Sequence, residues 1–109
     1  MTVHSIAKTP EPPYYAVVFT STRIGGDRGY RKTADEMLKL AREQDGFLGI
    51  ESMRDPDGFG IAVSYWKTLE AIQGWKEQAE HRKAQEQGKA VWYRDYHIRI
   101  CRVEKEYGL

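Results

Sequence analysis

The order in which strand-like and helix-like segments follow one another constrains the fold of this chain most. Four segments are rich in aromatic and β-branched residues and are predicted to be strands, namely residues 14–23, 47–54, 59–66 and 91–103. One helical segment separates the first strand from the second, and another separates the third from the fourth. A strong Asp-Pro-Asp-Gly turn at residues 55–58 joins the middle two. This order predicts an α+β, ferredoxin-like β-α-β-β-α-β fold with a four-stranded antiparallel sheet.

The two helical segments are recognised by the spacing of their apolar residues. Residues 30–44 predict an amphipathic helix, because apolar side chains recur at offsets of three, four and seven between charged ones: Ala34, Met37, Leu38 and Ala41. The second helix is expected to start at Thr68, whose hydroxyl can cap the exposed amides. A similar spacing continues along it through Leu69, Ile72, Trp75 and Ala79. A short helix is expected to follow, in which His81, Ala84, Gln85 and Gly88 fall at offsets of three, four and seven. This helical spacing predicts that His81 faces the interior of the protein.

Length and charge limit the class of protein. At 109 residues the chain is expected to form one domain, residues 14–107, after a flexible lead-in, residues 1–13, that contains three prolines. Its 17 basic and 16 acidic residues are interspersed, so no basic stripe predicts binding to nucleic acid or to an anionic membrane. No apolar run reaches the roughly 18 residues that span a bilayer. A single cysteine, Cys101, cannot form an internal disulfide, and a cytoplasmic location is therefore expected.

The first strand has apolar residues at both sets of alternating positions. Tyr15, Val17 and Phe19 would lie on one face, and Ala16 and Val18 on the other. Two helices cover only one face of a four-stranded sheet, so the second face needs another partner. Because exposed apolar faces mark interaction surfaces, the sequence predicts a homodimer about a two-fold axis.

The chemistry is expected in residues 64–107, which hold all three tryptophans and two of the three histidines. His81 titrates near neutrality and can take a proton from a phenol or donate to a developing oxyanion. The alternative is a helix-end histidine bonded to backbone. No metal site is predicted, because three convergent ligands are needed and no paired spacing is present. Cys101 is expected to be a small buried hydrophobe, and residues 24–29 a plain strand-to-helix turn, since no Lys-Ser/Thr follows the glycines.

Several segments of the chain together resemble a known family. The segment QDGFLGIESMRD at residues 44–55, the strand IAVSYW at 61–66, the sequence KTLEA at 67–71 and Trp75 together resemble the antibiotic biosynthesis monooxygenase family. The tail HRKAQEQGKAVWYRDYHIRICRVEKEYG at residues 81–108 resembles the little-characterised bacterial members of this family. The resemblance covers about residues 14–107 and implies a small dimeric α/β barrel. Members of this superfamily include cofactor-free oxygenases of aromatic polyketides, haem-degrading enzymes, and proteins without a known activity.

The functional residues of each branch can be compared with this sequence one at a time. In the haem-degrading branch a tryptophan on the second helix, a histidine ten residues later and an asparagine in the first strand are functional. Trp75 matches the tryptophan, but Gln85 stands at the histidine position and the first strand has no asparagine. Haem degradation by that mechanism is therefore not expected. The polyketide-oxidising branch has a pocket tryptophan with polar partners, for which Trp66, Trp75 and His81 are the candidates.

The resemblance thus implies a cofactor-independent monooxygenase that oxidises a small electron-rich aromatic compound with O2. His81 and Trp75 are the expected catalytic residues. The expected substrate pocket contains Trp66, Phe19, Arg82 and Gln85, with Arg82 as partner of an anionic substrate. The alternative for the tryptophans is a place in the core, and for Arg82 a solvated face. The alternative function is a non-catalytic dimeric module that binds a hydrophobic ligand or haem.

Overall fold

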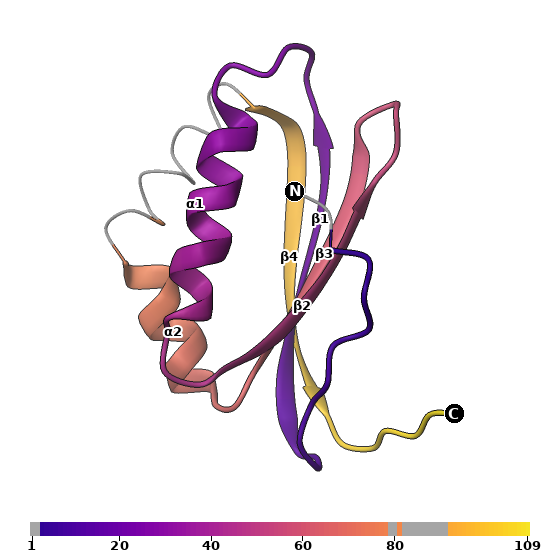
Figure 1. The fold of residues 1–109 in the computed structure, drawn as a ribbon, viewed down its shortest axis with the longest axis vertical. Coiled ribbons are helices and arrows are strands. Elements are labelled where there is room, and N and C mark those ends of the chain that lie inside the picture. Colours follow the sequence, from indigo (N-terminus) through magenta and orange to yellow (C-terminus); the bar gives the residue numbers. More distant parts are fainter. Residues whose placement is uncertain (1–2, 79–80, 82–91) are drawn as a thin grey trace.

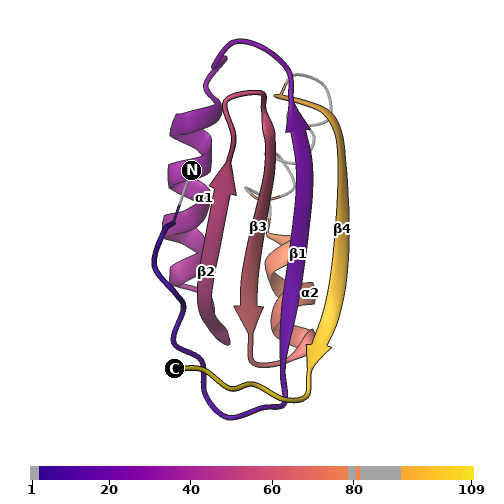
Figure 2. The ribbon, with the colours of Figure 1, turned by 90° about the vertical axis from the view of Figure 1, so that its right-hand side faces the viewer.

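A computed structural model describes residues 3–78, 81 and 92–109. Its elements follow in the predicted order: β1 (Tyr14–Arg23), α1 (Tyr30–Arg42), β2 (Phe47–Arg54), β3 (Phe59–Trp66), α2 (Leu69–Glu77) and β4 (Tyr93–Val103). The strands form one antiparallel sheet in the order β2-β3-β1-β4. Helices α1 and α2 lie on the same face of this sheet (Figure 1), and no helix of the described residues lies on the opposite face (Figure 2). The ferredoxin-like fold is confirmed.

The ends of the helices follow from local chemistry. The Thr68 hydroxyl accepts a hydrogen bond from the backbone N–H of Ala71 at 3.0 Å, so the predicted cap of α2 is confirmed. Helix α1 ends two residues before the predicted Gln44, whose amide still bonds to the carbonyl of Ala41. Helix α2 ends at Glu77 because Gln78 has a ψ of 132°. The apolar spacing of α2 therefore stops before the predicted Ala79, but His81 faces the protein interior as predicted. Ala84, Gln85 and Gly88 lie outside the described residues.

Strand β4 contains an irregularity that the alternation of its sequence does not reveal. Its pairing with β1 matches Ser21 with Tyr96 and Thr22 with Asp95, but Arg23 with Tyr93, which leaves Arg94 as an extra residue. Side chains three residues apart on a regular strand point to opposite faces. The bulge instead turns both Tyr93 and Tyr96 toward the helices, where their ring centroids lie 5.9 Å apart.

The core lies between the sheet and the two helices. Its most buried large side chains are Trp66, Ile72 and Trp92. Leu69 was predicted to belong to the apolar stripe of α2 but is half exposed, because it occupies the first residue of the helix. Cys101 was predicted to be buried and is exposed, because it lies on the helix-free face, which no described element covers.

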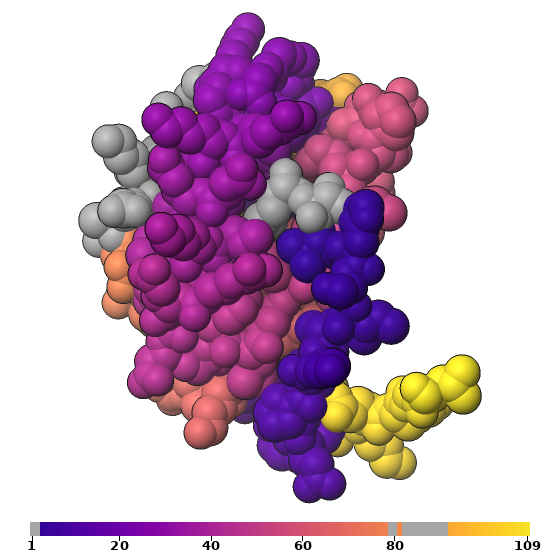
Figure 3. Space-filling view, in the orientation of Figure 1, coloured from indigo at the N-terminus to yellow at the C-terminus, as the bar shows by residue number. Residues whose placement is uncertain are grey.

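The helix-free face retains exposed apolar side chains. Met53, Phe59 and Ile61 are 63%, 49% and 42% exposed, and all three lie on this face by their register. The lead-in runs along the β2 edge, where Val3 pairs with Ser52 and the Ala7 amide donates to the Glu51 carboxylate. Figure 3 shows the lead-in against the side of the molecule and the C-terminal tail projecting from it. No helix among the described residues is long and apolar enough to cross a membrane.

Candidate functional site

A cavity of about 450 Å³ lies between the sheet and the two helices. Every strand and both helices contribute to its wall, and most of the side chains that line it are apolar, among them Val17, Met37, Leu38, Ala62, Ile72 and Ile100. Ile98 and Ile100 are 39% and 54% exposed, so the cavity is open to solvent along β4. A concave, mostly apolar pocket with a few convergent polar groups is the usual form of a small-molecule site.

Two tryptophans form the end of the cavity near α2. Trp66 ends β3 and is fully buried, and its indole Nε1 donates a hydrogen bond to the Ser64 hydroxyl at 2.9 Å. Trp75 of α2 stacks on Trp66, with ring centroids 6.1 Å apart and an interplanar angle of 28°. Phe47 meets Trp66 edge-on at 5.3 Å. This cluster gives the pocket a rigid aromatic wall.

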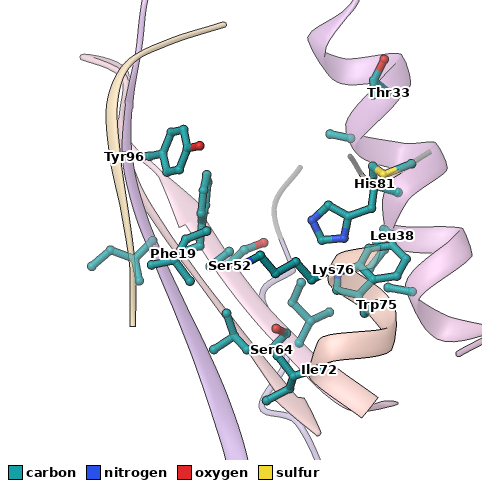
Figure 4. A pocket seen from close by; sticks show the side chains of 18 of the residues that line it. Phe19, Thr33, Leu38, Ser52, Ser64, Ile72, Trp75, Lys76, His81 and Tyr96 are labelled. Atoms are coloured by element: carbon teal, nitrogen blue, oxygen red, sulfur yellow. The ribbon is translucent and has the colours of Figure 1, made fainter. Parts of the chain in front are cut away.

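The imidazole of His81 lies against the other side of Trp75. Their ring centroids are 4.3 Å apart, and the imidazole points into the cavity (Figure 4). Its Nδ1 atom is buried and has no hydrogen-bond partner among the described residues. Burial lowers the pKa of His81 from its ordinary value of 6.5, and the Trp75 backbone carbonyl partly opposes that shift. The imidazole is therefore neutral at neutral pH and can accept a proton.

Four of the six predicted site residues line this one cavity. Trp66, Trp75 and His81 lie at its α2 end, and Phe19 projects from β1. Phe19 packs edge-on against Tyr93 and at a tilt against Tyr96, both at 5.5 Å between ring centroids. The other two, Arg82 and Gln85, lie outside the described residues, and their roles stay predictions.

The opposite end of the cavity holds a basic group that the sequence interpretation missed. Arg54, the last residue of β2, lines the cavity and donates to the Ser21 hydroxyl at 2.7 Å, to the Ser21 carbonyl at 3.3 Å and to the Gly58 carbonyl. Its guanidinium lies across Gly60, where an added Cβ would come within 2.8 Å of the Arg54 Cζ. A glycine inside a predicted strand signals such a close approach, and Gly60 was the available clue.

Two tyrosines flank Arg54. Its Cζ lies 5.9 Å from the centroid of the Tyr30 ring and 5.8 Å from that of Tyr93. The guanidinium of Arg23 lies over the Tyr30 ring at 3.8 Å. Burial, and then the neighbouring Tyr30, raise the pKa of Tyr93 far above its usual range, although both arginines lower it. Tyr93 therefore stays a neutral phenol that can donate a hydrogen bond.

The site offers acid–base and hydrogen-bonding groups. Among residues 3–78, 81 and 92–109, no three histidine, cysteine, aspartate or glutamate side chains converge in a way that could hold a metal ion. The polar side chains near α2 include the neutral imidazole of His81 and the side chain of Lys76, and those at the β2–β3 turn are a guanidinium with two phenols (Figure 4). An apolar ligand with one or two polar substituents is the chemistry that this arrangement suits.

Comparison with known proteins places these observations in a family. Residues 13–87 match the antibiotic biosynthesis monooxygenase family. The chain is 50% identical over 101 residues to the uncharacterised protein YqjZ of Bacillus subtilis, covering 93% of this chain and 89% of that protein. It is 33% identical over 62 residues to a jasmonate monooxygenase of Pyricularia oryzae, covering 54% of this chain and 28% of that protein.

Solved structures share the fold at low identity. SnoaB, a cofactor-independent oxygenase from Streptomyces nogalater, superposes with a TM-score of 0.74 at 12% identity, covering 87% of this chain and 97% of SnoaB. Rv0793 from Mycobacterium tuberculosis superposes with a TM-score of 0.75 at 14% identity, covering 87% and 99%. The ferredoxin-like α+β fold is thus shared with these proteins. The chain belongs to the antibiotic biosynthesis monooxygenase family.

Proposed function

We propose that this protein is a cofactor-independent monooxygenase that oxidises a small electron-rich aromatic compound with O2 in the cavity between the sheet and the helices. The observation that carries the proposal is the His81 imidazole, which lies buried beside Trp75 with its Nδ1 atom unpaired among the described residues. Membership of the family and the fold shared with the cofactor-independent oxygenase SnoaB support it.

His81 supplies the step that such a reaction requires from the protein. An activated CH2 or phenol gives its proton to the neutral imidazole, and the resulting carbanion or phenolate is electron-rich enough to react with O2. A C–O bond forms, the imidazolium returns its proton to the peroxide anion, and the resulting hydroperoxide loses water to leave a carbonyl group. One oxygen atom enters the product and the other leaves as water, so the substrate provides all the electrons and no external reductant is needed.

The aromatic wall fixes where the reacting ring lies. Trp66 and Trp75 present stacked faces at the same end of the cavity as His81. A planar substrate ring that packs against them would place its acidic hydrogen near the imidazole. Apolar surroundings also disfavour charged His81 before the reaction, and they favour a base that accepts its proton only when the substrate anion forms beside it.

We propose that the working form is a homodimer joined through the helix-free face of the sheet. Exposed Met53, Phe59 and Ile61 on that face support this, since burying them removes apolar surface from water. The pairing leaves the cavity on the helix side of each subunit. Each subunit would then carry its own site.

The test is product analysis under labelled oxygen. Chelator-treated protein is incubated with anthrone under 18O2, and the product is compared with that formed in buffer alone. The proposal predicts anthraquinone at a rate above buffer, with one 18O atom in the new carbonyl and one O2 consumed for each product molecule. Product formation no faster than in buffer, or oxygen that comes from water, would contradict it.

A second candidate function is a non-catalytic module that binds a hydrophobic ligand or haem. The predominantly apolar lining of the cavity favours it, because binding alone needs no base. Titration with haemin distinguishes the haem form of this function. A saturable, stoichiometric shift of the Soret band that His81→Ala removes would favour it, whereas unsaturable, variant-independent absorption would exclude specific haem binding through His81.

A further inference from the structure

We propose that the end of the cavity at Arg54 is an anion subsite, and that the natural ligand is an aromatic compound carrying a carboxylate. This inference rests on the proposed function only in assuming that the same cavity holds the ligand. In this proposal the guanidinium of Arg54 binds the carboxylate, and the phenol of Tyr93 donates a hydrogen bond to it. The reacting ring would lie at the other end, against Trp66 and Trp75.

Among the described residues, no carboxylate pairs with the guanidinium of Arg54. Within the part of the chain that the structure describes, the one ion pair joins Arg102 to Glu104, and it lies on exposed side chains. Arg54 instead bonds to the Ser21 hydroxyl and to the carbonyls of Ser21 and Gly58, all of them neutral. A partly buried cation without a carboxylate partner is costly, which favours an anion from outside the chain.

The hydrogen bonds of Arg54 leave donors for such an anion. A guanidinium has five N–H groups, and the three bonds to Ser21 and Gly58 use three of them. The same bonds hold the side chain in one orientation across Gly60, so that little conformational entropy is lost when a ligand binds. A fixed, planar guanidinium is the group that best matches the two oxygens of a carboxylate.

Neighbouring groups add to the positive character of this end. Arg23 lies over the Tyr30 ring and donates to the carbonyls of Gly26 and Asp27, and its buried Nε atom has no partner among the described residues. Tyr93 faces the same space because of the bulge in β4, and it remains protonated. Arg54 and the neutral phenol of Tyr93 thus line the same end of the cavity, and Arg23, which does not line it, lies over the ring of Tyr30, which does.

The spacing of the two ends sets the form of the ligand. Gly60, beneath Arg54, and Trp66 are six residues apart on β3, which corresponds to about 20 Å along the strand. A ligand that meets both ends therefore has an extended shape, with its acid group separated from the ring that reacts. A compact ligand would reach one end of the cavity at a time.

The test compares two probes of equal shape that differ in charge, 2-naphthoate and 2-naphthamide, by calorimetric titration of the intact chain. The unmodified protein is expected to bind naphthoate about tenfold more tightly than naphthamide. In Arg54→Met the preference should fall to about one, while Arg54→Lys keeps part of it. Arg42→Met is the matched control, because it removes one exposed positive charge at the far end of α1 and should keep the full preference.

The ratio of the two dissociation constants does not depend on the fraction of folded protein, so a partly unfolded variant still gives a valid result. Equal binding of both probes to the unmodified protein, or no binding of either, would overturn the inference. A preference that survives in Arg54→Met would do the same. The titration consumes no oxygen. A clear preference for naphthoate in a protein that forms no oxidised product would therefore support the anion subsite and reject the proposed oxygenase function.

Discussion

The imidazole of His81 lies 4.3 Å from the indole of Trp75, ring centre to ring centre, inside a cavity that both residues line. The helix that carries Trp75 ends at Glu77, before His81. The two rings therefore meet across the end of this helix and not along one of its faces. Trp75 in turn stacks on the fully buried Trp66. The position of the candidate base is therefore tied to the core of the domain.

Replacing His81 with glutamine should change how stability depends on pH. The pKa of His81 is lower in the folded protein than its ordinary value of 6.5, so the unfolded chain binds more protons at His81 in the acidic range. The free energy of unfolding should fall as the pH drops below about 6.5 and level off below the folded pKa. Urea unfolding at pH 7.5 and pH 5 would show a smaller difference in His81→Gln than in the unmodified chain. His4→Gln, at an exposed histidine, should behave like the unmodified protein.

Trp75→Ala should destabilise the domain as well as open the pocket. The substitution removes the stacked partner of Trp66 and the surface against which His81 packs, and we expect a loss of about 2 kcal/mol for a side chain that is only partly buried. Trp75→Phe keeps an aromatic ring and should cost less than half as much. Urea unfolding followed by circular dichroism measures both. Equal stability of the alanine variant and the unmodified chain would show that the stack does not support the fold.

Gly60→Ala tests the position of Arg54 directly. The added methyl group would lie 2.8 Å from the Cζ of Arg54 and 2.9 Å from its Nη1, so the guanidinium must move. We expect a loss of about 1–2 kcal/mol in the free energy of unfolding. In an Arg54→Ala background the same change should cost less, because the guanidinium is gone and only the Cβ of residue 54, at 3.0 Å, remains close to the added methyl group. A double-mutant cycle measures this coupling, and additive effects of the two substitutions would place Arg54 elsewhere.

Val63→Arg should separate the proposed homodimer. Val63 pairs with Val18 near the middle of the helix-free face, where an arginine is tolerated in a single subunit but would be buried without a partner between two sheets. Sedimentation velocity should give about twice the 12.6 kDa chain mass for the unmodified protein and a value near the chain mass for the variant. Met53→Arg, near the edge of the same face, should weaken the dimer less. A monomeric unmodified chain would reject the dimer.

The fold was predictable because each element carries a local signal. The Thr68 cap and the turn at residues 55–58 form hydrogen bonds between residues close in the sequence. The alternation of apolar residues in a strand can be read without knowing which strand pairs with it. The two ends of the pocket were predictable to different degrees. Trp66 and Trp75 stand out by residue type, whereas Arg54 becomes part of the site only through its pairing with Gly60 across two strands.

Other parts of the site depend on geometry that one sequence does not specify. Tyr93 and Tyr96 both face the pocket because of a bulge at Arg94, and nothing in the composition of β4 marks the place of the extra residue. The position of His81 was predicted from helical spacing, which does not specify how the chain turns at Gln78, where α2 has ended. In both cases the direction of the side chain depends on the backbone conformation between the named residues, and tertiary packing sets that conformation.

The most direct test of the central claim is the rate of oxygen uptake with anthrone at pH 7.5, measured for chelator-treated unmodified protein, His81→Gln and His4→Gln. If His81 is the base, the unmodified chain consumes oxygen well above the buffer rate, and His81→Gln loses about 100-fold of that increment while remaining folded. His4→Gln should match the unmodified chain. Uptake in His81→Gln equal to that of the unmodified protein, or no uptake above buffer by any of the three, would contradict the claim.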